Sequence, residues 1–150
     1  MEKTVFKKYV NEILVGGGFV RKGSAWYLTS TDAIIVIGLQ KSDHAEKFYF
    51  NFGIWLRSLG EAEYPKDHKC HISGRLSGLF PEAVTLLDEA GTLNEGSDSK
   101  LSELLDFMRR EVLPFCHVFQ SLSGVRDQLV AGRFSRLLVM RDVKKFLMDG

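Results

Sequence analysis

The sequence predicts an α+β domain with an N-terminal helix, a mainly antiparallel four-stranded sheet, and a helical C-terminal half packed on that sheet. Three observations support this prediction. Apolar residues recur at helical spacing near the N-terminus, form strand patterns between residues 19 and 77, and return to helical spacing after residue 82. The connections between the predicted strands are short, which makes antiparallel neighbours the expected arrangement.

Residues 4–15 form the predicted N-terminal helix, because their apolar side chains recur on one side and their charged side chains lie on the other. Gly16, Gly17 and Gly18 follow and are expected to end the helix, since glycine tolerates the left-handed conformation of a C-cap. A phosphate-binding loop would follow a strand, so these glycines do not predict one.

The sheet is predicted from four stretches of sequence. Residues 19–28 form the first strand, with a bulge or turn at Gly23. Residues 33–40 are apolar and β-branched, which is typical of a central strand covered on both faces. Residues 47–56 alternate clearly between two faces. Residues 70–77 are the fourth predicted strand.

The second half is predicted to be helical. A short helix is expected over residues 82–89, and a longer one begins near residue 99. Pro114 is expected to kink or end this longer helix, because proline lacks the backbone N–H that a helix interior needs. Another helix is expected over residues 115–130, and the last predicted helix carries Leu137, Leu138, Phe146 and Leu147.

The chain has 150 residues, which suggests a single domain over residues 1–150. A domain of this size buries roughly 68–70% of the surface that its unfolded chain exposes, so stability requires neither a metal nor a disulfide. Eleven phenylalanines predict a core rich in phenylalanine. We expect no cofactor.

Charge and cysteine content limit the classes of protein. The net charge of +1 gives no overall attraction to nucleic acid or to an anionic membrane. The N-terminus lacks the apolar stretch of a signal peptide, and no run is long enough to span a membrane. Cys70 and Cys116 are too few for a disulfide scaffold. We therefore expect a cytoplasmic protein with reduced thiols that binds neither nucleic acid nor a membrane.

Several short motifs occur in a fixed order along the first half. They are Gly18-Phe19, Trp26-Tyr27, Leu39-Gln40-Lys41-Ser42 and Phe50-Asn51-Phe52-Gly53-Ile54. With the preceding helix, this order resembles the bacterial domain of unknown function 4304 family over roughly residues 4–80. The resemblance implies a shared α+β fold. It supplies no catalytic residue, because none is established in that family.

One face of the predicted sheet is the leading candidate for a binding site. Alternation places polar and aromatic side chains together there, and the candidate ligand-binding residues are Gln40, Asn51, Trp55, His71 and Arg75. Arginine supplies a fork for carboxylate or phosphate, and tryptophan supplies a stacking surface. Gly38 and Gly53 would let another group approach the backbone. Alternatively, this face is simply solvated, or the C-terminal helices cover it and need the glycines for clearance.

Two other combinations of residues give weaker indications, one of a metal site and one of a catalytic pair. His68, Cys70 and His71 lack the usual spacing of zinc ligands, and adjacent strand residues point to opposite faces, so no metal site is predicted. Cys116 and His117 diverge by roughly 100° on a helix, which is poor geometry for a thiolate–imidazole pair.

Two further groups of residues have an ordinary structural explanation. Glu61, Glu63 and Asp67 resemble a divalent-metal cluster, but an exposed charged loop has the same appearance and is commoner. Tyr49 and Trp55 would suit base stacking, but their strand lacks the flanking basic residues of an RNA-binding sheet.

For each candidate catalytic motif, an ordinary structural role explains the residues better than catalysis does. The leading hypothesis is therefore a non-enzymatic binding module that recognises a protein or a small polar ligand through the polar sheet face or through the loop at residues 57–69. One form of it is a toxin antagonist. The rival hypothesis is an enzyme or ligand sensor that uses Arg75, His71 and Asn51 around a polar pocket. The sequence predicts no oligomeric state.

Overall fold

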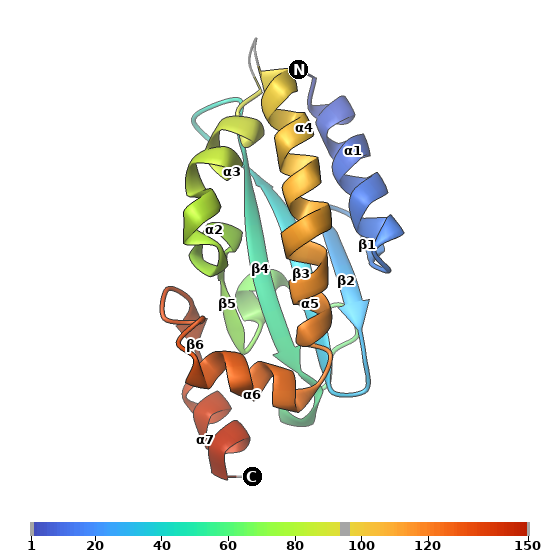
Figure 1. Cartoon of the computed structure of the whole chain (residues 1–150). Coiled ribbons are helices and arrows are strands. Elements are labelled where there is room, and N and C mark those ends of the chain that lie inside the picture. The colour runs from blue at the N-terminus through green and yellow to red at the C-terminus, as the bar shows by residue number, and fades with distance from the viewer. Residues whose placement is uncertain (1, 94–96, 150) are drawn as a thin grey trace.

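The computed structural model describes residues 2–93 and 97–149. Helices cover one face of an antiparallel sheet, and the first helix precedes the sheet, so the predicted α+β class is confirmed (Figure 1). The strands lie in the sheet in chain order. Within the described residues they are β1 (Val20–Lys22), β2 (Ala25–Thr29), β3 (Ala33–Lys41), β4 (Phe48–Leu56), β5 (Ile72–Arg75) and β6 (Leu138–Val139).

The predicted number of four strands was wrong, because the described sheet has six. Gly23 adopts a φ of 61°, and the tight turn there splits the first predicted strand into the hairpin of β1 and β2. Leu138, predicted to be helical, lies instead in β6 opposite Ser73. This pairing gives hydrogen-bond partners to backbone groups on the outer edge of β5. A strand of two residues is too short to show the alternation that identifies strands in a sequence, so the sequence did not predict it.

The helices lie in the predicted parts of the chain, but two predictions were wrong. Residues 115–130 are divided between two helices, and Leu76 and Ser77, predicted to end a strand, begin a helix. The helices are α1 (Lys3–Gly16), α2 (Leu76–Leu79), α3 (Val84–Gly91), α4 (Ser97–Phe107), α5 (Leu113–Val118), α6 (Leu122–Val130) and α7 (Arg141–Asp149). In Figure 1, α4 runs across the sheet with α1 beside it and α3 on its other side.

Pro114 does not end the helix in which it lies, so that alternative of the prediction was wrong. A π-helical segment at Met108–Val112 joins α4 directly to α5. The proline ring would collide with the carbonyl of residue 110 in a regular α-helix. The wider π turn contains that carbonyl, and it therefore lets the chain continue past the proline.

The main core lies between the sheet and the helices. Its aromatic part matches the predicted phenylalanine-rich core. The buried phenylalanines are Phe6, Phe19, Phe48, Phe50, Phe52, Phe80, Phe107, Phe119 and Phe134, and Trp26 is buried with them. Phe52 of β4 contacts Phe119, with ring centroids 5.8 Å apart. This layer buries the helical face of β3 and β4 at the centre of the sheet.

A second, smaller apolar cluster lies on the opposite face of the sheet. It consists of Tyr27, Ile34, Val36 and Cys70. The residues that cover it belong to the connection between β4 and β5, residues 57–71, which we call the covering segment; it includes the short helical turns Arg57–Leu59 and Asp67–Lys69. Ala33 to Leu39 are buried, which confirms that this strand is covered on both faces.

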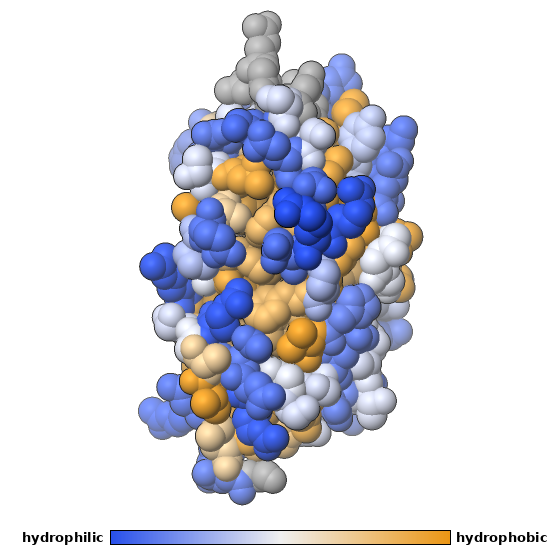
Figure 2. All heavy atoms as spheres, viewed as in Figure 1, coloured by the Kyte–Doolittle hydropathy of each residue, from blue (hydrophilic) through white to orange (hydrophobic). Residues whose placement is uncertain are grey.

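Polar side chains dominate the helical face, with apolar side chains visible between α3 and α4 and around β6 and α7 (Figure 2). At the β6–α7 corner, Leu138 and Met148 are exposed. In the described parts of the chain, no helix combines the length and apolarity needed to cross a bilayer.

Candidate functional site

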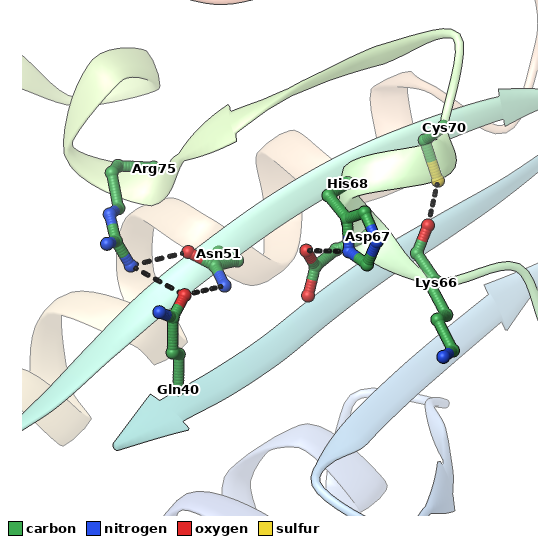
Figure 3. A network of polar contacts seen from close by, with 7 residues as sticks. All are labelled: Gln40, Asn51, Lys66, Asp67, His68, Cys70 and Arg75. Atoms are coloured by element: carbon green, nitrogen blue, oxygen red, sulfur yellow. Dashed lines mark hydrogen bonds and ion pairs between the residues drawn. The ribbon is translucent and has the colours of Figure 1, made fainter. Parts of the chain in front are cut away.

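Three strands present polar side chains on the part of the second face that the covering segment leaves open. Gln40 near the end of β3 lies opposite Tyr49 of β4, and Asn51 lies opposite Arg75 of β5. Paired residues of antiparallel strands point to the same face. The structure therefore brings together Gln40, Asn51 and Arg75, three of the five residues predicted for the site (Figure 3).

These three side chains form one hydrogen-bonded group. Arg75 Nη1 donates to Asn51 Oδ1 at 2.7 Å and to Gln40 Oε1 at 3.3 Å. Asn51 Nδ2 donates to the same Gln40 oxygen at 3.0 Å. Two neutral amides thus hold the guanidinium group, and Figure 3 shows all three side chains converging.

Arg75 keeps hydrogen-bond donors for a ligand. Both of its hydrogen bonds use Nη1, and its guanidinium group lies over the Tyr49 ring, 4.2 Å from the centroid. Among residues 2–93 and 97–149, Nε and Nη2 have no protein acceptor and no carboxylate forms an ion pair with Arg75. The Nε–Nη2 edge is one that binds a carboxylate or phosphate with two parallel hydrogen bonds.

A concavity of about 610 Å³ lies beside this group. Besides the three polar residues, Asp67, His68 and Ser73 line it. In Figure 3 the Asp67 carboxylate lies between the Asn51 amide and the His68 ring. The concavity therefore has a cationic group on β5 and an anionic group on the covering segment.

Trp55 and His71 lie away from this concavity, although the sequence grouped them with it. The rings contact each other with centroids 4.3 Å apart. Trp55 Nε1 donates to the Gly60 carbonyl at 3.0 Å, and the Leu56 amide donates to His71 Nδ1 at 2.9 Å. Both side chains attach the covering segment to β4. Burial lowers the pKa of His71, while the Asp142 carboxylate acts in the opposite direction.

The glycines of this face give clearance to the covering segment. A Cβ at Gly53 would lie 2.7 Å from Cys70 Sγ and 3.0 Å from the Asp67 carbonyl oxygen. A Cβ at Gly38 would collide with the Asp67 carboxylate. The sequence alternatives assigned this role to a ligand or to the C-terminal helices, but the connection between β4 and β5 occupies the space.

The cysteines are buried and separate from the concavity. Burial, with a smaller effect of Asp67, raises the pKa of the Cys70 thiol to about 12. Burial also raises the pKa of Cys116 to about 12. His117 Nδ1 and Nε2 lie 2.8 Å from Gln120 Oε1 and 3.1 Å from the Gly17 carbonyl oxygen, so its ring joins α5 to the end of α1. In the part of the chain that the structure describes, no three His, Cys, Asp or Glu side chains are grouped to hold a metal.

Sequence reasoning left Tyr49 out of the candidate ligand-binding residues, and it included Asp67 and His68 only as part of the loop at residues 57–69, the alternative binding surface. Tyr49 was placed on the correct face by alternation, but its contact with Arg75 depends on the register between strands. Asp67 and His68 lie in a charged stretch that reads as an ordinary exposed loop. Two glycines on the facing strands are the signal that could have indicated a segment packed there.

The fold and site define a class of protein: an α+β domain with helices on one face of an antiparallel sheet and a polar concavity on the other. The sequence matches the family described as Domain of unknown function (DUF4304) over residues 10–117, and the chain belongs to that family. The matched range includes Gln40, Asn51 and Arg75. Neither the curated proteins nor the solved structures yielded a match to this chain.

Proposed function

We propose that this protein is a binding module that holds a small anionic polar ligand at Arg75. The observation that carries the proposal is the Nε–Nη2 edge of Arg75, which has no acceptor among the described residues while the rest of the group is held by Asn51, Gln40 and Tyr49. A guanidinium group fixed in this way loses little conformational freedom on binding. Carboxylates and phosphates match its geometry.

The ligand's other groups would meet amides and a carboxylate. Gln40 and Asn51 offer hydrogen bonds beside Arg75, and Asp67 disfavours negative charge at the opposite end of the concavity. These features favour a small molecule with one anionic group over a polyanion. A ligand sensor would bind its ligand through the same contacts. The proposed binding module therefore agrees with the ligand-sensor hypothesis from the sequence as well.

A protein ligand, including a toxin that the protein would antagonise, stays a prediction from sequence. A thermal-shift panel of carboxylates, amino acids, sugar phosphates and nucleotides separates it from the small-ligand proposal. A ligand at 100 times its Kd stabilises the fold by about 2.7 kcal/mol, which raises Tm by several degrees. No shift with any anion would contradict the small-ligand proposal and favour a protein partner.

Arg75→Gln is expected to weaken binding of the anion found in that panel by about tenfold or more, because charge-assisted hydrogen bonds are lost. Arg75 is exposed, so the free energy of unfolding should change by only about 0.5 kcal/mol. Titration calorimetry and urea unfolding measure the two quantities.

Arg126→Gln is the matched control, since Arg126 is an exposed arginine on α6 outside the concavity. It removes the same charge and should leave the affinity unchanged. Equal loss of affinity in both variants would show that net charge, and not the Arg75 site, attracts the anion.

A further inference from the structure

Arg75 also lines a second hollow, and it is the one residue that the linings of this hollow and of the polar concavity share. This edge hollow has a volume of about 160 Å³. Its lining residues include Phe48, Tyr49, Phe50, Val84, Leu87 and Asp88. It therefore lies between the beginning of β4 and helix α3.

The edge hollow exists because β5 is shorter than β4. β5 pairs with β4 only from Asn51 to Ile54, and the chain then leaves the sheet to form α2 at Leu76. The described residues place no strand beside Phe48–Phe50 on that side. Side chains of α3 approach this part of β4 and leave an apolar space.

Apolar side chains provide most of the lining of the edge hollow. Phe48, Phe50 and Leu87 are buried core residues, and Val84 is half exposed at the rim. Asp88 is already paired with Lys47. An apolar cavity of about 150 Å³ is large enough to bind benzene. The edge hollow is open to solvent and also has Ser77 and Asp88 in its lining, but its volume and its apolar wall suit one phenyl-sized group.

We propose that the ligand carries an apolar group of benzene size attached to its anionic group. The anionic group binds the Nε–Nη2 edge of Arg75, and the apolar group enters the edge hollow beside Tyr49 and Val84. Small aromatic carboxylates have this chemistry. The inference rests on the proposed function, because both use Arg75 as the anion-binding group.

Three probes separate the two parts of the ligand. Phenylacetate carries both groups, acetate carries only the anion, and 2-phenylethanol carries only the ring. We expect phenylacetate to bind about tenfold or more tightly than either of the other two, since burial of a phenyl group adds to the affinity that Arg75 provides. Titration of the amide NMR signals measures all three affinities, including weak ones.

Val84→Phe tests the edge hollow without changing the anion site. Val84 is 51% exposed, so a larger side chain fits at the rim without disturbing the core. The variant should bind phenylacetate no better than acetate and should bind acetate as the wild type does. Val130→Phe is the control, because Val130 is 67% exposed on α6 and lies outside both hollows.

The outcomes separate failure of the inference from failure of the proposed function. If acetate binds at Arg75 but phenylacetate binds no better, or if Val84→Phe keeps the full gain, the inference is overturned and the anion site stands. If neither acetate nor phenylacetate shifts signals around Arg75, and no other anion of the panel does so, the proposed function fails together with the inference.

Discussion

Replacing Gly53 with alanine is expected to lower the free energy of unfolding by about 2 kcal/mol, because the site has no room for a methyl group. The new Cβ would lie 2.7 Å from Cys70 Sγ and 3.0 Å from the Asp67 carbonyl oxygen. A backbone carbonyl cannot rotate away as a side chain can. The covering segment would therefore have to move off the sheet, and the apolar cluster beneath it would lose contacts. Urea unfolding measures the change.

Gly38→Ala is the matched control for this prediction. Its Cβ would meet the Asp67 carboxylate, which is the end of a side chain and can turn aside, so we expect a smaller loss than at Gly53. Adding Cys70→Ala to Gly53→Ala should restore part of the lost stability, since it removes the closest contact. Equal stability of Gly53→Ala and the wild type would show that the covering segment does not pack tightly on β4.

Replacing His71 with alanine is expected to cost about 2 kcal/mol, chiefly because the buried Leu56 amide would lose its acceptor. The contact with the Trp55 ring would be lost as well. His71→Asn keeps a side-chain oxygen that can accept from Leu56, so this variant should retain more stability. Urea unfolding at pH 7.5, where the wild-type histidine is neutral, compares the three proteins.

His71 is also expected to make stability depend on pH. Its pKa in the folded protein is lowered from the ordinary histidine value of 6.5, mainly by burial. As the pH falls below 6.5, the unfolded chain binds a proton that the folded protein resists, so unfolding becomes easier. The His71 contribution is therefore complete above pH 6.5 and decreases between 6.5 and the lower folded pKa.

Unfolding of the wild type and His71→Asn between pH 5 and pH 7.5 checks this dependence. The asparagine cannot be protonated in this range, so the difference between the two proteins should change with pH in the direction given above. A constant difference across the range would show that His71 has the same pKa in both states of the wild type. Asp142 is the group that opposes the effect, and Asp142→Asn should enlarge it.

Much of the site could be predicted because strand alternation is a local property. The pattern of residues 47–56 placed Asn51 on the open face, and short connections predicted that β3 and β5 flank β4. The actual register then brought Arg75 beside Asn51. What alternation cannot give is position along a strand: Trp55 shares a face with Asn51 but lies beneath the covering segment.

The errors in the fold came from interactions between distant residues. Leu138 forms a strand because β5 offers a free edge, and no pattern in residues 137–139 reports that edge. Pro114 continues a helix because the π turn before it relieves the steric conflict, which a rule based on proline alone does not include. The edge hollow beside Arg75 was equally hidden, since it depends on the length of β5 relative to β4.

The order of strands in the sheet has a consequence for solubility. The two outermost strands, β1 and β6, have only three and two residues, whereas the long apolar strands β3 and β4 lie in the middle. A short edge offers few open backbone groups to a neighbouring molecule, and Arg21 and Lys22 add positive charge to β1. The paired parts of these long apolar strands are therefore shielded in the native state, and helix α3 instead of a strand lies beside Phe48–Phe50. Aggregation through the apolar strands should require the molecule to open.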